Sequence, residues 1–198
     1  MGVYIDERLN WEEHIRQVAS RVSKTIGVLS RLKPLLSCKV LKMVYNSLVL
    51  PNLTYFNLIW SNACESRINR IIVLQKKSIR IISKTTYLAH TNPLFKKLGL
   101  LKMCDIRCHQ ILIFMYKFSR SLLPENFVNY LCETCKTHSH LTRNSTGYNI
   151  PLAKTGVRKR SIRIEVPRLW NSLDSNIRNA VSLPVFKRKF KCFLLSKY

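Results

Sequence analysis

The sequence predicts a mainly α-helical protein with one or two short β-strands and a smaller C-terminal helical region. Apolar residues recur at the three-to-four-residue spacing of a helix face along most of the chain. Hydrophobic residues make up 46% of the 198 residues, which is enough to form a sizeable core. Residues 132–160 are polar, rich in Ser and Thr, and aperiodic, so we expect a loop or linker between the two helical regions.

The first elements are a short strand and a long helix. Residues 2–5 are predicted to form the strand, and Asn10 is predicted to cap a helix over 11–33, with Glu13 completing a capping box. Pro34 ends that helix. Its apolar face comprises Trp11, Ile15, Val18, Val22, Ile26 and Leu29, and its opposite face carries Arg16, Lys24 and Arg31.

Two further helices follow in the first half. One begins near Ser37, and Pro51 kinks or restarts it before Trp60. The other covers 65–84. The inward residues of the earlier helix are predicted to be Val40, Val44 and Leu48. The later helix has an apolar face of Ile68, Ile71, Ile72, Ile79 and Ile82, opposite Arg70, Lys77, Arg80 and Lys84.

A fourth apolar stripe runs from Leu101 to Leu122 and is stopped by Pro124; Cys104 and Cys108 lie within this stripe, so we expect both thiols in the core. Residues 161–166 are predicted to form a second short strand, and the segment PRLWNSL to begin a final helical region. The last helix starts at Ser182. Its predicted inner face is Leu183, Phe186, Phe190 and Phe193.

Charge is the most informative compositional property. Lys and Arg total 34 against 10 Asp and Glu, giving a net charge of +24 and a pI near 10.2. Such a field favours a polyanionic partner, either nucleic acid or an anionic membrane surface, although a basic protein can also simply remain soluble. We favour nucleic acid and expect no membrane association. The longest apolar stretch, 48–60, is too short to cross a bilayer and contains Pro51.

Cysteine usage indicates the compartment. Seven cysteines is an odd number, and their spacing resembles no secreted disulfide framework. The first residues lack the basic start and apolar run of a secretory signal. We therefore expect reduced thiols in an intracellular compartment, with nucleus and cytoplasm not distinguished.

Four segments carry a resemblance to a known family. They lie in the family's order and together span nearly the whole chain: MGVYIDERLNWEEHI, VYNSLVLPNLTYFNLIWSNA, LQKKSIRIIS and PRLWNSLDSNIRNAVSLPVFKRKFKCFLL. The first resembles the LGV-x-I-D-x-x-L-x-W-x-x-H-I segment that follows the palm in LINE-type (non-long-terminal-repeat) retrotransposon reverse transcriptases, the Jockey-like group above all. Val166 and Asp174 depart from the family's PRLWNSLP pattern, where Gly and Pro are usual.

The resemblance implies a chain that begins within a polymerase. Residues 1–10 would be a remnant of the last palm hairpin, 11–131 a helical thumb-like domain, 132–160 a polar linker, and 161–198 a C-terminal strand with helices. The family's polymerase site uses an Asp-Asp pair to hold Mg²⁺. The sequence has only Asp6, Asp105 and Asp174 as aspartates, so we expect no polymerase activity and no cofactor. Mg²⁺ would belong to the missing palm.

In the family the thumb grips the template–primer, which implies RNA, DNA or an RNA–DNA hybrid as partner without strong sequence preference. A helix over 11–33 would be about 34 Å long, comparable with one turn of duplex. The residues we expect to contact phosphates are Arg16, Lys24, Arg31, Arg70, Lys77, Arg80 and Lys84. The alternative is that these are solvated basic faces.

The segment CETCKTHSH contains a candidate metal site. Cys132, Cys135, His138 and His140 are zinc-type ligands within nine residues. The usual second ligand pair lies about a dozen residues farther away, and two imidazoles in a His-x-His pair reach one metal poorly. We therefore predict a chance cluster and no metal.

A rival interpretation has no nucleic-acid role. The chain could act as a helical protein-interaction module, or could be a decayed reading frame with no function of its own. Loss of the palm would expose the surface that faced it, and this exposure favours self-association.

Overall fold

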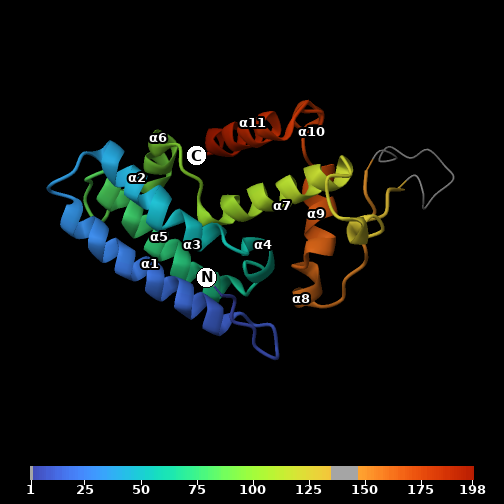
Figure 1. Ribbon diagram of the computed structural model, residues 1–198, viewed down its shortest axis with the longest axis horizontal. Helices are drawn as coiled ribbons and strands as arrows, with labels where there is room; N and C mark the ends of the chain where they lie inside the picture. Colours follow the sequence, from blue (N-terminus) through green and yellow to red (C-terminus); the bar gives the residue numbers. More distant parts are fainter. Residues whose placement is uncertain (1, 135–146) are drawn as a thin grey trace. The chain divides into compact units, whose positions relative to one another are not determined.

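The computed structural model describes residues 2–134 and 147–198 (Figure 1). The chain divides into two compact units. The first unit is Met1–Arg107 with Phe193–Tyr198, and the second is Cys108–Cys192. The division falls inside two helices, α7 (Met103–Ser119) and α11 (Leu183–Ser196).

The first unit is built from helices, as predicted. In chain order they are α1 (Glu12–Leu32), α2 (Cys38–Leu48), α3 (Leu50–Thr54), α4 (Asn57–Trp60), α5 (Glu65–Ile82), α6 (Thr91–Leu98) and the start of α7. The expected helix from Ser37 to Trp60 is thus three helices. Pro51 occupies the first turn of α3, where the missing N–H of proline costs no helical hydrogen bond.

The apolar face predicted for the first helix is confirmed. Its members from Trp11 to Leu29 are all buried and belong to the main core. The predicted cap is wrong, because Trp11 itself precedes the helix, in a left-handed conformation with φ of 60° and without a side-chain cap. Asn10 instead donates its backbone N–H to Asp6 Oδ1 at 2.7 Å. Residues 6–10 therefore form a turn that the sequence pattern did not indicate.

The strand predicted at residues 2–5 is also absent. The backbone there is irregular, and the Ile5 side chain is 71% exposed. Within the described ranges no strand lies beside it, and an unpaired strand leaves its backbone groups without partners.

On α2 the buried face is displaced by one residue from the prediction. Leu41 and Tyr45 are buried, whereas Val40 and Leu48 are largely exposed. Two apolar stripes lie side by side on this helix, so periodicity alone selects either one. The stripe with Tyr45 is the buried one, and the Tyr45 hydroxyl accepts a hydrogen bond from the buried Gln75 of α5.

Gln75 is the polar centre of the first unit. Its Nε2 donates to Tyr45 Oη at 2.9 Å and to the Leu101 carbonyl at 3.0 Å, and its Oε1 accepts the Met103 N–H at 2.8 Å. Burial raises the pKa of Tyr45 to about 12, and the Gln75 hydrogen bond opposes that rise. The side chain thereby joins α5, α2 and the start of α7.

The C-terminal residue packs in the same unit. The Tyr198 hydroxyl accepts the Lys102 N–H at 2.9 Å and donates to the Asp105 carboxylate. Its ring meets Phe95 edge-on with centroids 6.2 Å apart, and Lys102 Nζ lies 3.9 Å from the ring centroid. Burial raises the pKa of the Tyr198 hydroxyl above its usual range, and the hydrogen bond to Asp105 adds to this rise.

The second unit surrounds an aromatic cluster. Its elements are the rest of α7, the 3₁₀ helix η1 (Glu125–Phe127), α8 (Gly156–Lys159), α9 (Ile162–Asn171), α10 (Ser175–Arg178) and most of α11. Phe186 of α11 stacks on Tyr116 of α7 with centroids 4.7 Å apart and lies 6.1 Å from Trp170 of α9. Tyr116 donates its hydroxyl to the Ala180 carbonyl at 2.9 Å.

Four predictions for this half of the chain need correction. Residues 162–166 belong to helix α9, which Ser161 precedes as N-cap, and not to a strand. Their alternating sequence IRIEV mimics a strand, but Ile164, Pro167 and Trp170 are buried at helical spacing. Short helix α8 forms inside the expected linker. Cys104 is exposed and Cys108 only partly buried. In α11, Phe186 and Phe190 are buried as predicted, but Leu194 replaces Phe193 inside.

Candidate nucleic-acid interface

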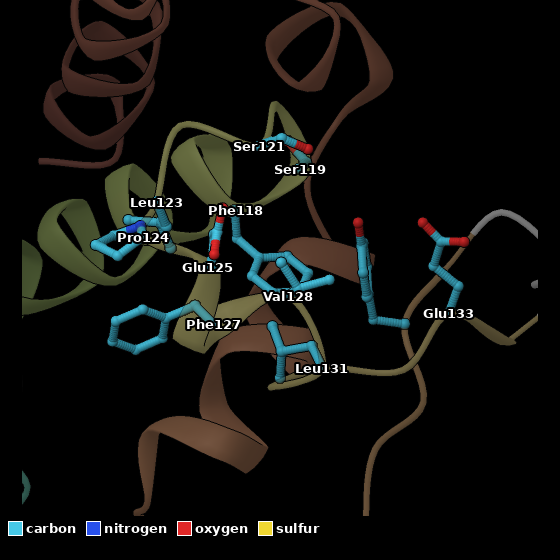
Figure 2. A pocket seen from close by; sticks show the side chains of 11 residues that line it. Phe118, Ser119, Ser121, Leu123, Pro124, Glu125, Phe127, Val128, Leu131 and Glu133 are labelled. Atoms are coloured by element: carbon cyan, nitrogen blue, oxygen red, sulfur yellow. The ribbon is translucent and has the colours of Figure 1, made fainter.

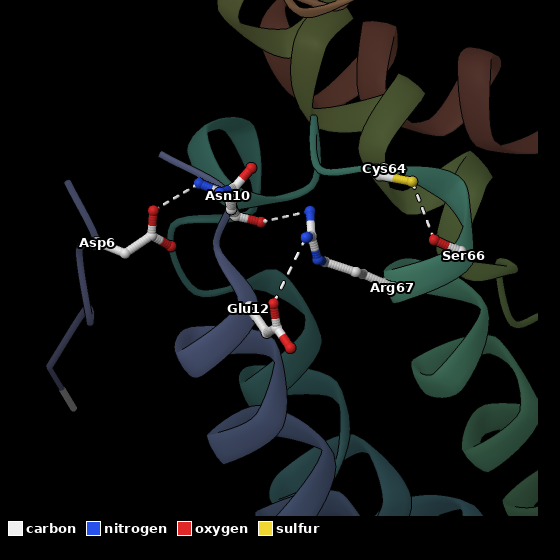
Figure 3. Close-up of polar contacts among 6 residues, drawn as sticks. All are labelled: Asp6, Asn10, Glu12, Cys64, Ser66 and Arg67. Carbon is white, nitrogen blue, oxygen red and sulfur yellow. Dashed lines mark hydrogen bonds and ion pairs between the residues drawn. The ribbon is translucent and has the colours of Figure 1, made fainter. Parts of the chain in front are cut away.

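Helices α1 and α5 begin close together. Arg67, in the first turn of α5, reaches the Asn10 carbonyl at 3.5 Å and the Glu12 carboxylate at 3.4 Å (Figure 3). α1 packs more extensively on α5 than on any other helix. Ile68 and Ile71 of α5 are buried in the same core as the apolar face of α1. The two long basic helices are therefore held as one layer.

A surface hollow of about 500 Å³ lies between these two helices. Its lining comprises Ala19, Ser20, Ser23 and Lys24 from α1, and Asn69, Arg70, Val73 and Leu74 from α5. The structure thus brings together Lys24 and Arg70, which the sequence placed on separate helices. Both side chains are exposed, so their charged ends are open to a ligand.

The hollow is electrostatically positive. Between residues 14 and 104 the sequence contains a single acidic residue, Glu65. The carboxylates of the two helices gather in their first turns, at Glu12, Glu13 and Glu65. Among the residues that the structure describes, Lys24 and Arg70 form no ion pair. Two uncompensated cations with hydroxyl and amide donors beside them are the groups that bind phosphate oxygens.

Three other predicted residues are exposed but do not line the hollow: Arg16, Arg31 and Lys77. Arg16 is partly neutralised, because its Nε donates to Glu13 Oε2 at 2.9 Å. Hydrogen bonds from Gln17 and Arg16 lower the pKa of Glu13, which keeps this carboxylate charged. Arg31 is in the last turn of α1. Lys77 follows Arg70 two helical turns later on α5.

The last two predicted residues are placed differently. Arg80 is half-buried and donates Nε to the Ala89 carbonyl at 2.9 Å, with its guanidinium 5.7 Å from the Tyr87 ring centroid. It therefore fastens the segment that follows α5. Lys84 lies beyond the end of α5, in a left-handed conformation with φ of 54°. Neither residue contributes to the hollow.

Sequence reasoning missed the neutral members of the hollow, Ser20, Ser23 and Asn69. The available signal was their position, because Ser20 lies one helical turn before Lys24 and Asn69 is adjacent to Arg70. That signal becomes specific only once α1 and α5 are known to be neighbours.

A second hollow, of about 370 Å³, lies in the second unit (Figure 2). Apolar and aromatic side chains, including Phe118, Phe127 and Leu131, form much of its wall, and two carboxylates, Glu125 and Glu133, also line it. Carboxylates repel phosphate, so this hollow is chemically unsuited to a nucleic-acid backbone.

The Cys–His cluster that we predicted to be a chance grouping lies only partly within the described residues. Cys132 is exposed, and Cys135, His138 and His140 lie outside the described residues. In the described part of the chain, no three His, Cys, Asp or Glu residues are grouped so as to hold a metal ion. The described helices also include none that is both long and apolar enough to cross a membrane.

Comparison with known proteins gives two similar sequences from Drosophila melanogaster. The probable RNA-directed DNA polymerase from transposon X-element is 30% identical over 110 residues, and the RNA-directed DNA polymerase from mobile element jockey is 28% identical over 110 residues. Each alignment covers 53% of this chain and 12% of the relative, so the match spans about one eighth of their length. No family model and no solved structure matches the chain. The predicted resemblance to the LINE-type reverse transcriptases is confirmed over about half of the chain, which is similar to a segment of these polymerases.

Proposed function

We propose that this chain is the thumb and C-terminal portion of a retrotransposon RNA-directed DNA polymerase and that it binds nucleic acid through the hollow between α1 and α5. In this proposal, residues 1–10 are the palm remnant, 11–131 the thumb, 132–160 a linker and 161–198 the C-terminal region. The partner is RNA, DNA or an RNA–DNA hybrid, and the chain alone does not polymerise. Intracellular location, without membrane attachment or a metal, is part of the same proposal.

The observation that carries the proposal is the convergence of Lys24 and Arg70. The two residues come from different helices, line one hollow and are not neutralised by nearby carboxylates in the described structure. Arg31 on α1 and Lys77 on α5 add further positive charge along these helices. Arg16 contributes when its ion pair with Glu13 is broken. Contacts of this kind recognise the backbone and not the base sequence.

Salt dependence of binding tests the proposal. A double variant, Lys24→Gln with Arg70→Gln, should reduce the log–log salt slope for an RNA–DNA hybrid by about 2, because each lost phosphate contact releases about one counterion fewer. The charge-matched control is Lys39→Gln with Lys97→Gln, two exposed cations of α2 and α6 outside the hollow. Equal slopes for the double variant and the parent would reject the hollow as the interface.

A second candidate function, self-association, has its own supporting observation. Ile5 and Leu9 are 71% and 56% exposed, and they lie in the segment that we assign to the palm remnant. Light scattering should show dimers that dissociate on changing Ile5 and Leu9 to Ser. A monomeric parent chain at all concentrations would exclude this function.

A further inference from the structure

Helix α11 carries a dense basic cluster in the second unit. Its cations within that unit are Lys187, Arg188, Lys189 and Lys191, and the helix contains no acidic residue. None of the four forms an ion pair within the part of the chain that the structure describes. Their charge is therefore not offset locally.

Three of these cations share one side of the helix. Lys187, Arg188 and Lys191 fall within about 100° around the axis, at the spacing that makes helical neighbours. All three side chains are exposed. Lys189 points elsewhere and donates Nζ to the Asn176 carbonyl at 3.1 Å. Lys187, Arg188 and Lys191 together form the α11 basic face.

The opposite side of α11 is fixed by packing. Phe186 and Phe190 are buried and stack with centroids 6.2 Å apart, and His109 of α7 stacks on Phe190 at 5.9 Å. These apolar side chains are committed to the core of the unit and cannot insert into a bilayer. A packed helix whose exposed side carries three cations close together suits a nucleic-acid backbone better than a membrane surface.

The pKa of His109 depends on the charge of the α11 basic face. It is half-buried, with Nε2 3.3 Å from the Lys187 carbonyl oxygen. Burial lowers the pKa of His109, and the positive charges of Lys191 and Lys187 lower it further, whereas the contact with the Lys187 carbonyl opposes the shift. Neutralising those lysines with a bound anion should therefore raise the pKa of His109.

We propose that the α11 basic face is a second nucleic-acid interface, distinct in residues from the hollow between α1 and α5, and that its ligand is the sugar–phosphate backbone. Each unit then carries an interface of its own. Two interfaces on one chain raise the overall affinity for a polynucleotide long enough to reach both. The α11 basic face shares no residue with the hollow between α1 and α5. An experiment can therefore reject one interface and leave the other in place.

The first test uses the full chain and a labelled RNA. Changing Lys187, Arg188 and Lys191 together to Gln should reduce the log–log salt slope by about 2 to 3. The matched control changes three exposed cations elsewhere in the unit to Gln, namely Lys154, Lys159 and Arg168, and should leave the slope unchanged. Equal reductions in both variants would show that net charge and not this face governs binding, which would overturn the proposal.

Combination with the Lys24/Arg70 double variant separates the two interfaces. Residual RNA binding by that double variant should weaken further when the α11 basic face is also removed. If the α11 variant matches the parent while the double variant loses binding, the α11 proposal is wrong and the hollow stands. If only the α11 variant loses binding, the hollow is wrong. Binding to phosphatidylserine vesicles, but not to RNA, through the α11 basic face would also overturn the proposal.

A local readout completes the test. Histidine proton resonances, with His109 assigned from a His109→Gln variant, should report a higher pKa for His109 when RNA is saturating. The Lys154/Lys159/Arg168 variant should show the same rise. An unchanged pKa on saturation would place the phosphates away from Lys187 and Lys191 and contradict the proposal.

Discussion

At the scale of single residues, His14 ties the stability of the first unit to pH. Its ring is buried against Trp60, with centroids 5.5 Å apart, and Nε2 has no hydrogen-bond partner in the described structure. Burial lowers the pKa of His14 below its ordinary 6.5, and the charge of Arg21 adds to this effect. The unfolded chain therefore takes up the proton more readily than the folded chain.

The free energy of unfolding should therefore have its full value above about pH 6.5. It should decrease as the pH falls through the pKa that His14 has in the folded chain. Denaturant titrations across this range measure the fall. A His14→Phe variant, which cannot titrate, should show a shallower dependence below pH 6.5. An identical pH dependence in the variant would mean that His14 is not the group responsible.

Phe56 has a strained backbone conformation that should lower the free energy of unfolding. It precedes α4 with φ of 49°, a left-handed conformation that bulky residues rarely adopt, and half of its side chain is exposed. Phe56→Gly should raise the free energy of unfolding by about 0.5–1 kcal/mol, because glycine enters this region without steric penalty. Tyr55, with φ of −63°, provides the control, since Tyr55→Gly relieves no strain and should destabilise. A destabilised Phe56→Gly variant would contradict the strain argument.

At the scale of elements, Gln75 links three helices through buried hydrogen bonds. Gln75→Leu would leave the Met103 N–H and the Leu101 carbonyl without their partner, at about 1–3 kcal/mol for each buried group. We expect a loss of about 3 kcal/mol in chemical denaturation. Lys76→Leu, at the exposed neighbouring position, should change stability by less than about 0.5 kcal/mol. Similar losses in both variants would show that the hydrogen bonds of Gln75 are not the cause.

Elements with one clear apolar stripe were predictable from sequence, and ambiguous ones were not. The long helix over 11–33 has a single stripe from Trp11 to Leu29, and the structure buries it. On α2 two stripes compete, and the buried one includes Tyr45, whose hydrogen bond to Gln75 of α5 no periodicity reveals. The IRIEV segment fits both periods, and packing of Trp170 against Phe186 accompanies the helical one.

The candidate site was predictable only in part for the same reason. Charge and amphipathic spacing single out Lys24 and Arg70 on their separate helices. The pairing of α1 with α5 depends on core contacts far apart in sequence, and the polar side chains of the hollow carry no signal without it. Arg80 was predicted to contact phosphates, but it donates a hydrogen bond to the Ala89 carbonyl instead. Ala89 lies in the segment after α5, where helical periodicity makes no prediction.

At the scale of the whole molecule, the chain should lack polymerase activity. It contains three aspartates and no adjacent pair of them, whereas two-metal nucleotidyl transfer needs clustered carboxylates. We expect no primer extension with Mg²⁺ or Mn²⁺, measured with a labelled primer on an RNA template. Templated incorporation above the buffer control, retained through purification, would show that metal-binding carboxylates are present after all.

Photocrosslinking from within the hollow between α1 and α5 tests most directly whether nucleic acid binds there. A benzophenone amino acid at Ser23, an exposed residue of the lining, should crosslink to an RNA–DNA hybrid at low salt and lose the crosslink at high salt. The same probe at Ser47, exposed on α2 and outside the hollow, should give little product. Equal yields from both positions, or none from Ser23 while the hybrid is bound, would contradict the assignment of this hollow as the nucleic-acid interface.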